Sequence, residues 1–430
     1  MNDNEVTAAV CPPWVSLIKE HFTSTYLGDH GIMITNMNAD GSADDAEPVV
    51  SDFGDILPFL WHYGMHDFSV SQLELAKNWL KDGLYVSNGR TKLFFNHDWL
   101  LGLLDLYRQS GNKELLEMSE KGARTIERCF FQGDLLIDEP IRLNDWRTWL
   151  APASPFNGGY IELWLDIYRF TDNSDYLKLA ERSARGWINT PDFKQHGVFS
   201  RVICARSSML NKIAISRSRL RARLFKDNTN LVWSILVLFQ RTNDEQWRDA
   251  LYAWLDGFEK YFWNKGDVHL MLDPALKGYN SSIKAGFSSL DLLCDMHDAK
   301  VDQERVLKMA TAIADFWLDN QWQNGLFPEV PGGDADHLDA NVDIVVGLAK
   351  LYAITQEQKY LDSLTLCREA VLTLHKMSLG YCQSVDSNGK PSDSRIKIKY
   401  QGLLTKLAIL PQDPIDIFKD VDKLELLRDR

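Results

Sequence analysis

An internal repeat constrains the fold more than any other feature of this 430-residue sequence. An apolar segment that ends in an aromatic residue or a leucine is followed by a polar turn and an amphipathic segment, and this unit recurs roughly every 50 to 70 residues. The hinge positions of the unit are Tyr107, Tyr168, Phe239, Leu293, Tyr352 and Leu407. A repeat of this length predicts a series of helical hairpins, each packed against its neighbours.

The turn of each predicted hairpin carries a hydroxyl at a fixed place. Three residues after the hinge stand Ser110, Thr171, Thr242 and Thr355, and eight residues after it stand Leu115, Tyr176, Trp247 and Tyr360. A hydroxyl that accepts backbone N–H bonds in a tight turn, followed by a large apolar residue, is typical of a helix-turn-helix hairpin.

The two helices of each hairpin differ in polarity. The helix before the hinge is apolar nearly all round and the helix after it is charged on one face, so the first is predicted to lie inside and the second outside. A weaker unit at 55–80 and a last inner helix at 400–410 complete the series. We expect an all-α toroid of helical hairpins, (α/α)6, rather than an open solenoid. It would span 51–412, with an N-terminal extension at 1–50 and a tail at 413–430.

Net charge and composition exclude several classes of protein. Asp and Glu number 60 against 47 Lys and Arg, a net charge of −13, which is unfavourable for a protein that binds a phosphate backbone. The polar start and the lack of a long apolar run predict no signal peptide, no membrane span and a cytoplasmic location. Scattered cysteines and the absence of nucleotide-binding motifs predict no metal and no cofactor.

Four asparagines precede the hinges by eleven residues, namely Asn96, Asn157, Asn228 and Asn341. We expect each amide to cap the first N–H groups of an inner helix. If all inner helices run the same way around a ring, these positions gather at one mouth with the helix N-termini.

Carboxylates, histidines, amides and aromatic residues accompany these asparagines, and the segment Ser51–Asp55 adds two further carboxylates. A concave opening with such side chains suits a sugar, whose hydroxyls form hydrogen bonds and whose pyranose faces stack on aromatic rings. The candidate catalytic residues are His97, Asp98, Asp145, Glu329, His337 and Asp339. The candidate substrate contacts are Trp99, Trp146, Arg147, Asn157, Tyr160, Arg219, Arg221, Tyr279, Asn341 and Asp343.

Residues 50–410, through the hairpin repeat, the Leu-Tyr-x-x-Thr turn and the polar mouth, resemble the six-hairpin (α/α)6 toroid carbohydrate enzymes. That group includes unsaturated glucuronyl hydrolases, N-acylglucosamine 2-epimerases and polysaccharide lyases. The resemblance implies the toroid fold and a carbohydrate substrate. The sequence has no His-Pro-Gly-His segment of the epimerase kind, so no subfamily's catalytic residues are carried over.

The arginine-rich run 216–223 stands out in an acidic protein, and its period of two predicts an extended segment. Guanidinium groups bind carboxylates in a fork geometry, which favours an acidic, uronate-type sugar. We therefore expect general acid–base catalysis on such a sugar, with hydrolysis first and epimerisation, isomerisation or elimination as alternatives. A non-catalytic helical-repeat scaffold remains the alternative from another class.

Overall fold

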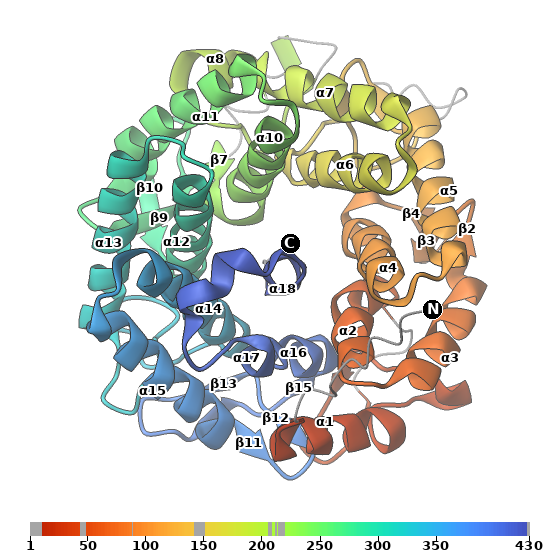
Figure 1. Cartoon of the computed structure of the whole chain (residues 1–430), viewed down its shortest axis with the longest axis vertical. Helices are drawn as coiled ribbons and strands as arrows, with labels where there is room; N and C mark the ends of the chain where they lie inside the picture. The colour runs from red at the N-terminus through yellow and green to blue at the C-terminus, as the bar shows by residue number, and fades with distance from the viewer. Residues whose placement is uncertain are drawn as a thin grey trace.

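The computed structural model describes residues 11–43, 49–87, 89–141, 151–204, 209–210, 213 and 220–427. Its helices form two concentric rings (Figure 1). The inner ring holds α2 (Ser51–His62), α4 (His97–Ser110), α6 (Tyr160–Thr171), α10 (Thr229–Thr242), α12 (Ile283–Asp298) and α14 (Leu338–Thr355). Their outer partners are α3 (His66–Ala76), α5 (Lys113–Cys129), α7 (Ser174–Ile188), α11 (Glu245–Gly257), α13 (Gln303–Asn320) and α15 (Gln358–Leu374). The predicted toroid of helical hairpins is confirmed.

Short helices close the ring between α14 and α2. They are α16 (Ile398–Leu403) and α17 (Lys406–Ile409), and α1 (Pro13–Ser24) lies on their outer side (Figure 1). The N-terminal segment is tied to this region by the β1–β15 strand pair and by the Tyr26 hydroxyl, which donates to the Leu379 carbonyl at 2.8 Å. Because the ring is closed, an open solenoid is excluded.

The hinge turns form as their recurring hydroxyls predict. In four hairpins the hydroxyl donates to the carbonyl four residues back and accepts the N–H two residues ahead; the residues are Ser110, Thr171, Thr242 and Thr355. The next residue is left-handed in each case, and its N–H donates to the hinge carbonyl. These bonds satisfy carbonyls that the end of the inner helix leaves without partners.

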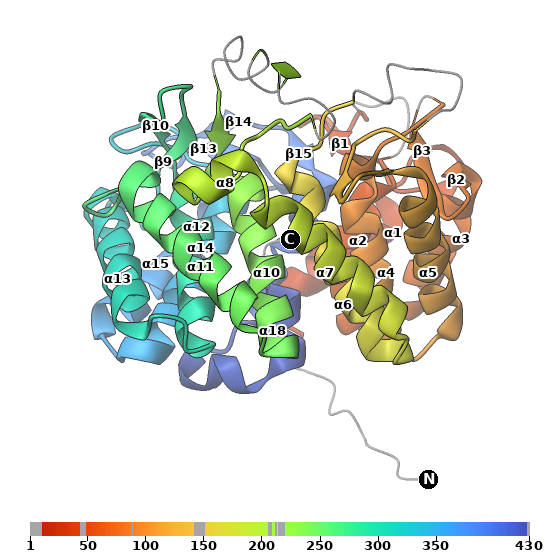
Figure 2. The same cartoon turned by 90° about the horizontal axis from the view of Figure 1, so that it is seen from above.

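Short antiparallel strands gather at the end where the inner helices begin, which we call the mouth (Figure 2). They are β1 (Asn36–Met37), β2 (Leu80–Lys81), β3 (Leu84–Ser87), β4 (Arg90–Thr91), β5 (Phe131–Gln132), β6 (Leu135–Leu136), β7 (Ala222–Arg223), β8 (Trp263–Asn264), β9 (Asp267–Leu272), β10 (Gly278–Ser281), β11 (Lys376–Met377), β12 (Gly380–Tyr381), β13 (Ser384–Val385), β14 (Pro391–Asp393) and β15 (Ile396–Lys397). In the largest sheet β9 pairs with β7, β8 and β10, and Tyr279 stands opposite Met271. The extended end of the arginine-rich run is β7.

The opposite end of the ring holds the hinge turns and the C-terminal segment. Helix α18 (Val421–Leu427) lies in the centre of the ring (Figure 1). Its Glu425 carboxylate accepts from Arg108 of α4 and, at 3.2 Å, from Arg169 of α6. We call the space that the inner helices enclose the lumen, and α18 forms its floor. One further short helix, α8 (Pro191–His196), follows α7.

The hydrophobic core fills the layer between the two rings. Its largest buried side chains are Trp99, Trp164, Trp187, Trp233, Trp247, Trp254 and Trp317. Among the helices of the described residues, none has the length and apolarity that crossing a bilayer requires.

Candidate functional site

The first two inner helices approach closely enough to bring two carboxylates together. Gly54 of α2 faces Gly102 of α4, and a Cβ atom on Gly54 would lie only 1.8 Å from the carbonyl oxygen of Asp98. Only two glycines allow this backbone separation. Asp55 and Asp98, each beside this contact, therefore share one corner of the lumen mouth.

A lysine from the last inner helix joins these carboxylates. Lys399 of α16 contacts the Asp55 carboxylate, and its Nζ lies 3.3 Å from Asp98 Oδ2. We call these three residues the Asp55–Asp98–Lys399 cluster. It lines a cavity of about 40 Å³ together with Lys226, Asp339, Lys406 and, at the floor, Glu425.

The two carboxyl groups of the cluster have opposite pKa shifts. Burial and the negative charge of Asp98 raise the pKa of Asp55 to about 7, although Lys399 opposes the shift. Burial also disfavours ionisation of Asp98, but Lys399 and a hydrogen bond from His97 hold its pKa below the usual range. Two carboxyl groups in contact with one ammonium thus differ in protonation, which is the condition for one to act as an acid and the other as a base.

His97 is placed to orient Asp98. Its Nδ1 lies 3.1 Å from Asp98 Oδ1, and its ring packs edge-on against Tyr160 at 5.5 Å between centroids. Its Nε2 is buried, and a Cβ atom on Gly159 would lie 2.3 Å from it. The Tyr160 hydroxyl donates to the Leu93 carbonyl at 2.7 Å, so Tyr160 supports the histidine as a buried residue of the wall.

Helix α14 contributes the predicted acidic pair. The helix begins at Leu338, so Asp339 and Asp343 share one face as their spacing predicts. Asp339 lines the cavity of the cluster, and the Asp343 carboxylate accepts from Lys406 Nζ at 2.9 Å.

His337 and Glu329 lie nearby at the mouth. Burial and the positive charge of Lys284 lower the pKa of His337, so its imidazole is neutral at neutral pH. Glu329 is half exposed, and its carboxylate lies 3.5 Å from Lys284 Nζ.

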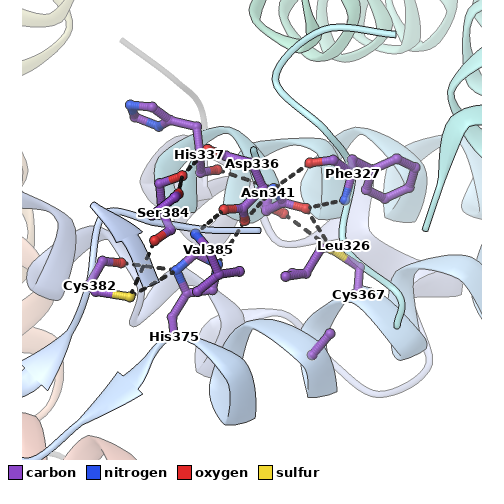
Figure 3. A network of polar contacts seen from close by, with 12 residues as sticks. Leu326, Phe327, Asp336, His337, Asn341, Cys367, His375, Cys382, Ser384 and Val385 are labelled. Carbon is purple, nitrogen blue, oxygen red and sulfur yellow. Dashed lines mark hydrogen bonds and ion pairs between the residues drawn. The ribbon is translucent and has the colours of Figure 1, made fainter. Parts of the chain in front are cut away.

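A buried polar network fixes the segment that leads into α14 (Figure 3). Asp336 Oδ2 accepts from His375 Nε2 at 2.7 Å and from Asn341 Nδ2 at 3.2 Å, while Asp336 Oδ1 accepts from the Val385 N–H at 2.7 Å. Burial opposes protonation of His375, but the Asp336 hydrogen bond raises its pKa to about 10. The ring of His337 points away from this network (Figure 3), so the network positions the backbone that carries it.

The recurring asparagines do not cap their helices, which corrects the expectation from the sequence. Asn96, Asn228 and Asn341 each accept from the N–H of one buried residue and donate to the carbonyl of that same residue, Tyr85, Phe199 and Phe327 respectively. Asn157 donates to the Leu136 carbonyl at 3.4 Å, and Gln401 makes the two-bond pattern with Tyr381. The segment before each inner helix is buried, and its peptide groups need these partners more than the helix end does. Asn157 and Asn341 are therefore buried parts of the wall.

The remaining predicted substrate contacts lie in different parts of the chain. Trp99 is 1% exposed and belongs to the core, because the residue after Asp98 faces the outer ring. Arg221 donates two hydrogen bonds to Asp192 and one to the Pro274 carbonyl, so its guanidinium group is already paired within the protein. Tyr279 is half-buried on β10 at the rim. Asp145, Trp146, Arg147 and Arg219 lie outside the described residues.

Several residues of the site were not assigned from the sequence. Lys399 and Lys226 line the cavity, as does Asp55, which the sequence predicts at the mouth but not as a catalytic candidate. The short spacing of Lys397 and Lys399 before an aromatic residue was the available signal, but nothing local says that it faces Asp55. Within the described ranges, no group of three His, Cys, Asp or Glu side chains could hold a metal ion.

Comparison with solved structures finds proteins of similar fold. No protein-family model and no curated protein sequence matches the chain. A D-mannose isomerase superposes with a TM-score of 0.59 at 11% identity, covering 96% of each chain. The cellobiose 2-epimerase from Bacillus thermoamylovorans gives 0.57 at 13% identity, over 91% of this chain and 99% of the other.

An α-1,2-mannosidase from Trichoderma reesei gives a TM-score of 0.65 at 13% identity, over 91% of this chain and 90% of the other. At this identity the likeness is one of fold. The chain therefore shares the (α/α)6 toroid fold with these enzymes.

Proposed function

We propose that this protein is a sugar-processing enzyme whose reacting groups are Asp55 and Asp98. The observation that carries the proposal is the Asp55–Asp98–Lys399 cluster, in which carboxyl groups from adjacent inner helices meet one ammonium beside a lumen cavity. Removing each of these charged groups from water costs free energy. Clusters of buried charges are therefore found mostly where a protein uses them for function.

The protonation states suit general acid–base catalysis. With its pKa raised to about 7 by burial and by Asp98, Asp55 holds a proton in about half of the molecules at neutral pH. Asp98 is ionised, and Lys399 and His97 stabilise its charge. Asp55 would donate a proton to a leaving oxygen, and Asp98 would act as the base or as the nucleophile.

Hydrolysis of a glycosidic bond is the reaction that this pair fits best. Glycosidases use one protonated and one ionised carboxyl group on either side of the scissile bond. The likeness in fold to a mannosidase supports the same class of reaction, because a fold of this kind can carry it.

Epimerisation or isomerisation is the second candidate, favoured by His337. This imidazole is neutral because burial and Lys284 lower its pKa, and its Nδ1 makes no hydrogen bond within the described residues. A neutral histidine can remove a proton from the carbon next to a carbonyl or carboxylate. The likeness in fold to a D-mannose isomerase and to a cellobiose 2-epimerase supports this class; uronate elimination would use the same base.

The substrate is proposed to be an acidic sugar. Lys226 lines the cavity with Asp98, and Lys397 stands on the strand that leads into α16, with its Nζ 4.7 Å from the Tyr400 ring centroid. An ammonium at each position would attract a sugar carboxylate. Because such attraction is screened by salt, KM for a uronide should rise with ionic strength while kcat changes less.

To test the proposal, the protein is incubated with a panel of neutral and uronic mono- and disaccharides. NMR then detects the products of hydrolysis, epimerisation, isomerisation or elimination. Asp98→Asn and Asp55→Asn should each lower turnover at least about a hundredfold with the fold intact, because a carboxamide keeps the shape but does not exchange the proton. Asp175→Asn, at an exposed ion pair with Lys178, is the control and should leave turnover unchanged. Full activity in both cluster variants, or no reaction with any sugar, would refute the proposal.

A further inference from the structure

One buried amide of the inner ring, that of Asn230, has no hydrogen-bond partner among the residues that the structure describes. Asn230, the second residue of α10, is 5% exposed, and its Oδ1 and Nδ2 make no hydrogen bond to any described residue. Asn228, two residues earlier, is fully hydrogen-bonded, because its Oδ1 accepts from the Phe199 N–H and its Nδ2 donates to the Phe199 carbonyl. A buried polar group without a partner lowers stability, and native proteins satisfy nearly all such groups. Asn230 is therefore retained at a cost that folding does not explain.

The position of Asn230 on α10 directs it to the lumen. Val237 and Arg241 follow it by seven and eleven residues, spacings that place all three on one face of a helix. Val237 and Arg241 line a lumen cavity of about 310 Å³. The amide therefore lies on the lumen-facing stripe of α10, at its mouth end.

The chain just before Asn230 reaches the cavity of the proposed reacting groups. Lys226, four residues before it, lines the cavity of the Asp55–Asp98–Lys399 cluster. That cavity and the 310 Å³ cavity share Glu425 as a lining residue, so the two adjoin within the lumen.

We propose that the Asn230 carboxamide is a specificity-determining contact that binds two neighbouring hydroxyls of the sugar held at the cluster. An amide offers a donor and an acceptor side by side, and each of two vicinal hydroxyls can accept or donate in turn. This inference rests on the proposed function, and it adds that the substrate presents a vicinal diol to α10.

The inference predicts opposite effects on stability and on substrate binding. Asn230→Leu removes the unpaired amide at similar volume, so the midpoint of thermal or urea unfolding should rise. KM for the best sugar of the panel should rise about tenfold or more, because the diol loses its partners. Asn228→Leu is the matched control, and its unfolding midpoint should fall because the Phe199 peptide groups lose theirs. Asn230→Ala is measured beside Asn230→Leu, since it removes the amide without adding a branched side chain.

The possible outcomes separate a failure of the proposed function from a failure of the proposed role of Asn230. A wild-type protein that neither binds nor converts any sugar contradicts the proposed function itself. Sugar conversion with an unchanged KM in Asn230→Leu and Asn230→Ala overturns only the role of Asn230. An unfolding midpoint that falls in both variants, as in Asn228→Leu, assigns the amide to the fold and also overturns the inference.

Discussion

The His375–Asp336 ion pair makes a quantitative prediction about stability and pH. Both side chains are fully buried, and His375 Nε2 lies 2.7 Å from Asp336 Oδ2 (Figure 3). His375 Nδ1 lies 2.9 Å from the Cys382 carbonyl, so both ring nitrogens have acceptors and the imidazolium is favoured. Its pKa rises from 6.5 to about 10 because these hydrogen bonds outweigh burial.

The sign and the size follow from the direction of this shift. The folded pKa of His375 exceeds the unfolded value, so the native state binds the proton more tightly than the unfolded chain does. The stabilisation is complete below pH 6.5 and is lost as the pH rises from 6.5 through 10. At about 1.4 kcal/mol for each pKa unit, the loss is on the order of 5 kcal/mol. Removing one member of a buried ion pair lowers the free energy of unfolding by a similar amount, about 3–5 kcal/mol.

The assay is urea unfolding of the wild type and of His375→Gln at pH values from 6 to 10. His375→Gln should be less stable by several kcal/mol at pH 6, and the difference should shrink toward pH 10. His297→Gln, at a half-buried histidine whose pKa is lowered by burial, is the control and should show no such convergence. Parallel stability curves for the wild type and His375→Gln would refute the assignment of a buried imidazolium.

Two further substitutions test the packing around the lumen. Gly159→Ala should destabilise the protein by about 1–3 kcal/mol and reduce turnover, because the new Cβ atom would displace His97 from Asp98; urea unfolding and kinetics check this. Glu425→Gln should cost about 1 kcal/mol in unfolding free energy by weakening the part-buried contact with Arg108 and the exposed contact with Arg169, and an unchanged urea midpoint would contradict the role of α18 as the lumen floor.

The hairpins could be predicted from the sequence because their signals are local. A hinge such as Tyr168 and the hydroxyl of Thr171 lie within one turn of chain, and the bond from the Asp172 N–H to the Tyr168 carbonyl involves only neighbours. Inner and outer helices likewise differ in polarity along a single segment. The fold class follows from these local rules repeated around the chain.

The site could be predicted only in part because its members come from distant repeats. His97, Asp98 and Asp339 were predicted from their places at helix starts, and these do line or border the lumen. Lys399 was missed because its partner Asp55 lies more than 300 residues earlier, and only ring closure brings them together. No local pattern encodes that contact.

The asparagine expectation failed for a related reason. A residue such as Asn228 at a helix start has two possible partners, the free N–H groups of the helix and the peptide groups of the segment packed beside it. The N–H groups of the helix can be predicted from the local sequence, but the peptide groups of the neighbouring segment cannot. Because the Phe199 segment is buried at the mouth, its peptide groups have no access to water, and the amide bonds to them instead.

Ring closure and the charges of the lumen depend on one another. The C-terminal part of the chain supplies Lys399 to Asp55 and Asp98, and Lys406 to Asp343, whose Oδ1 lies 2.9 Å from the ammonium. Without that segment, the buried carboxylates on α2, α4 and α14 would have no ammonium group beside them, which is unfavourable. The last inner helix therefore neutralises the repulsion that the earlier hairpins create. The two carboxyl groups still differ in proton affinity, because burial and the negative charge of Asp98 raise the pKa of Asp55 although Lys399 opposes that shift.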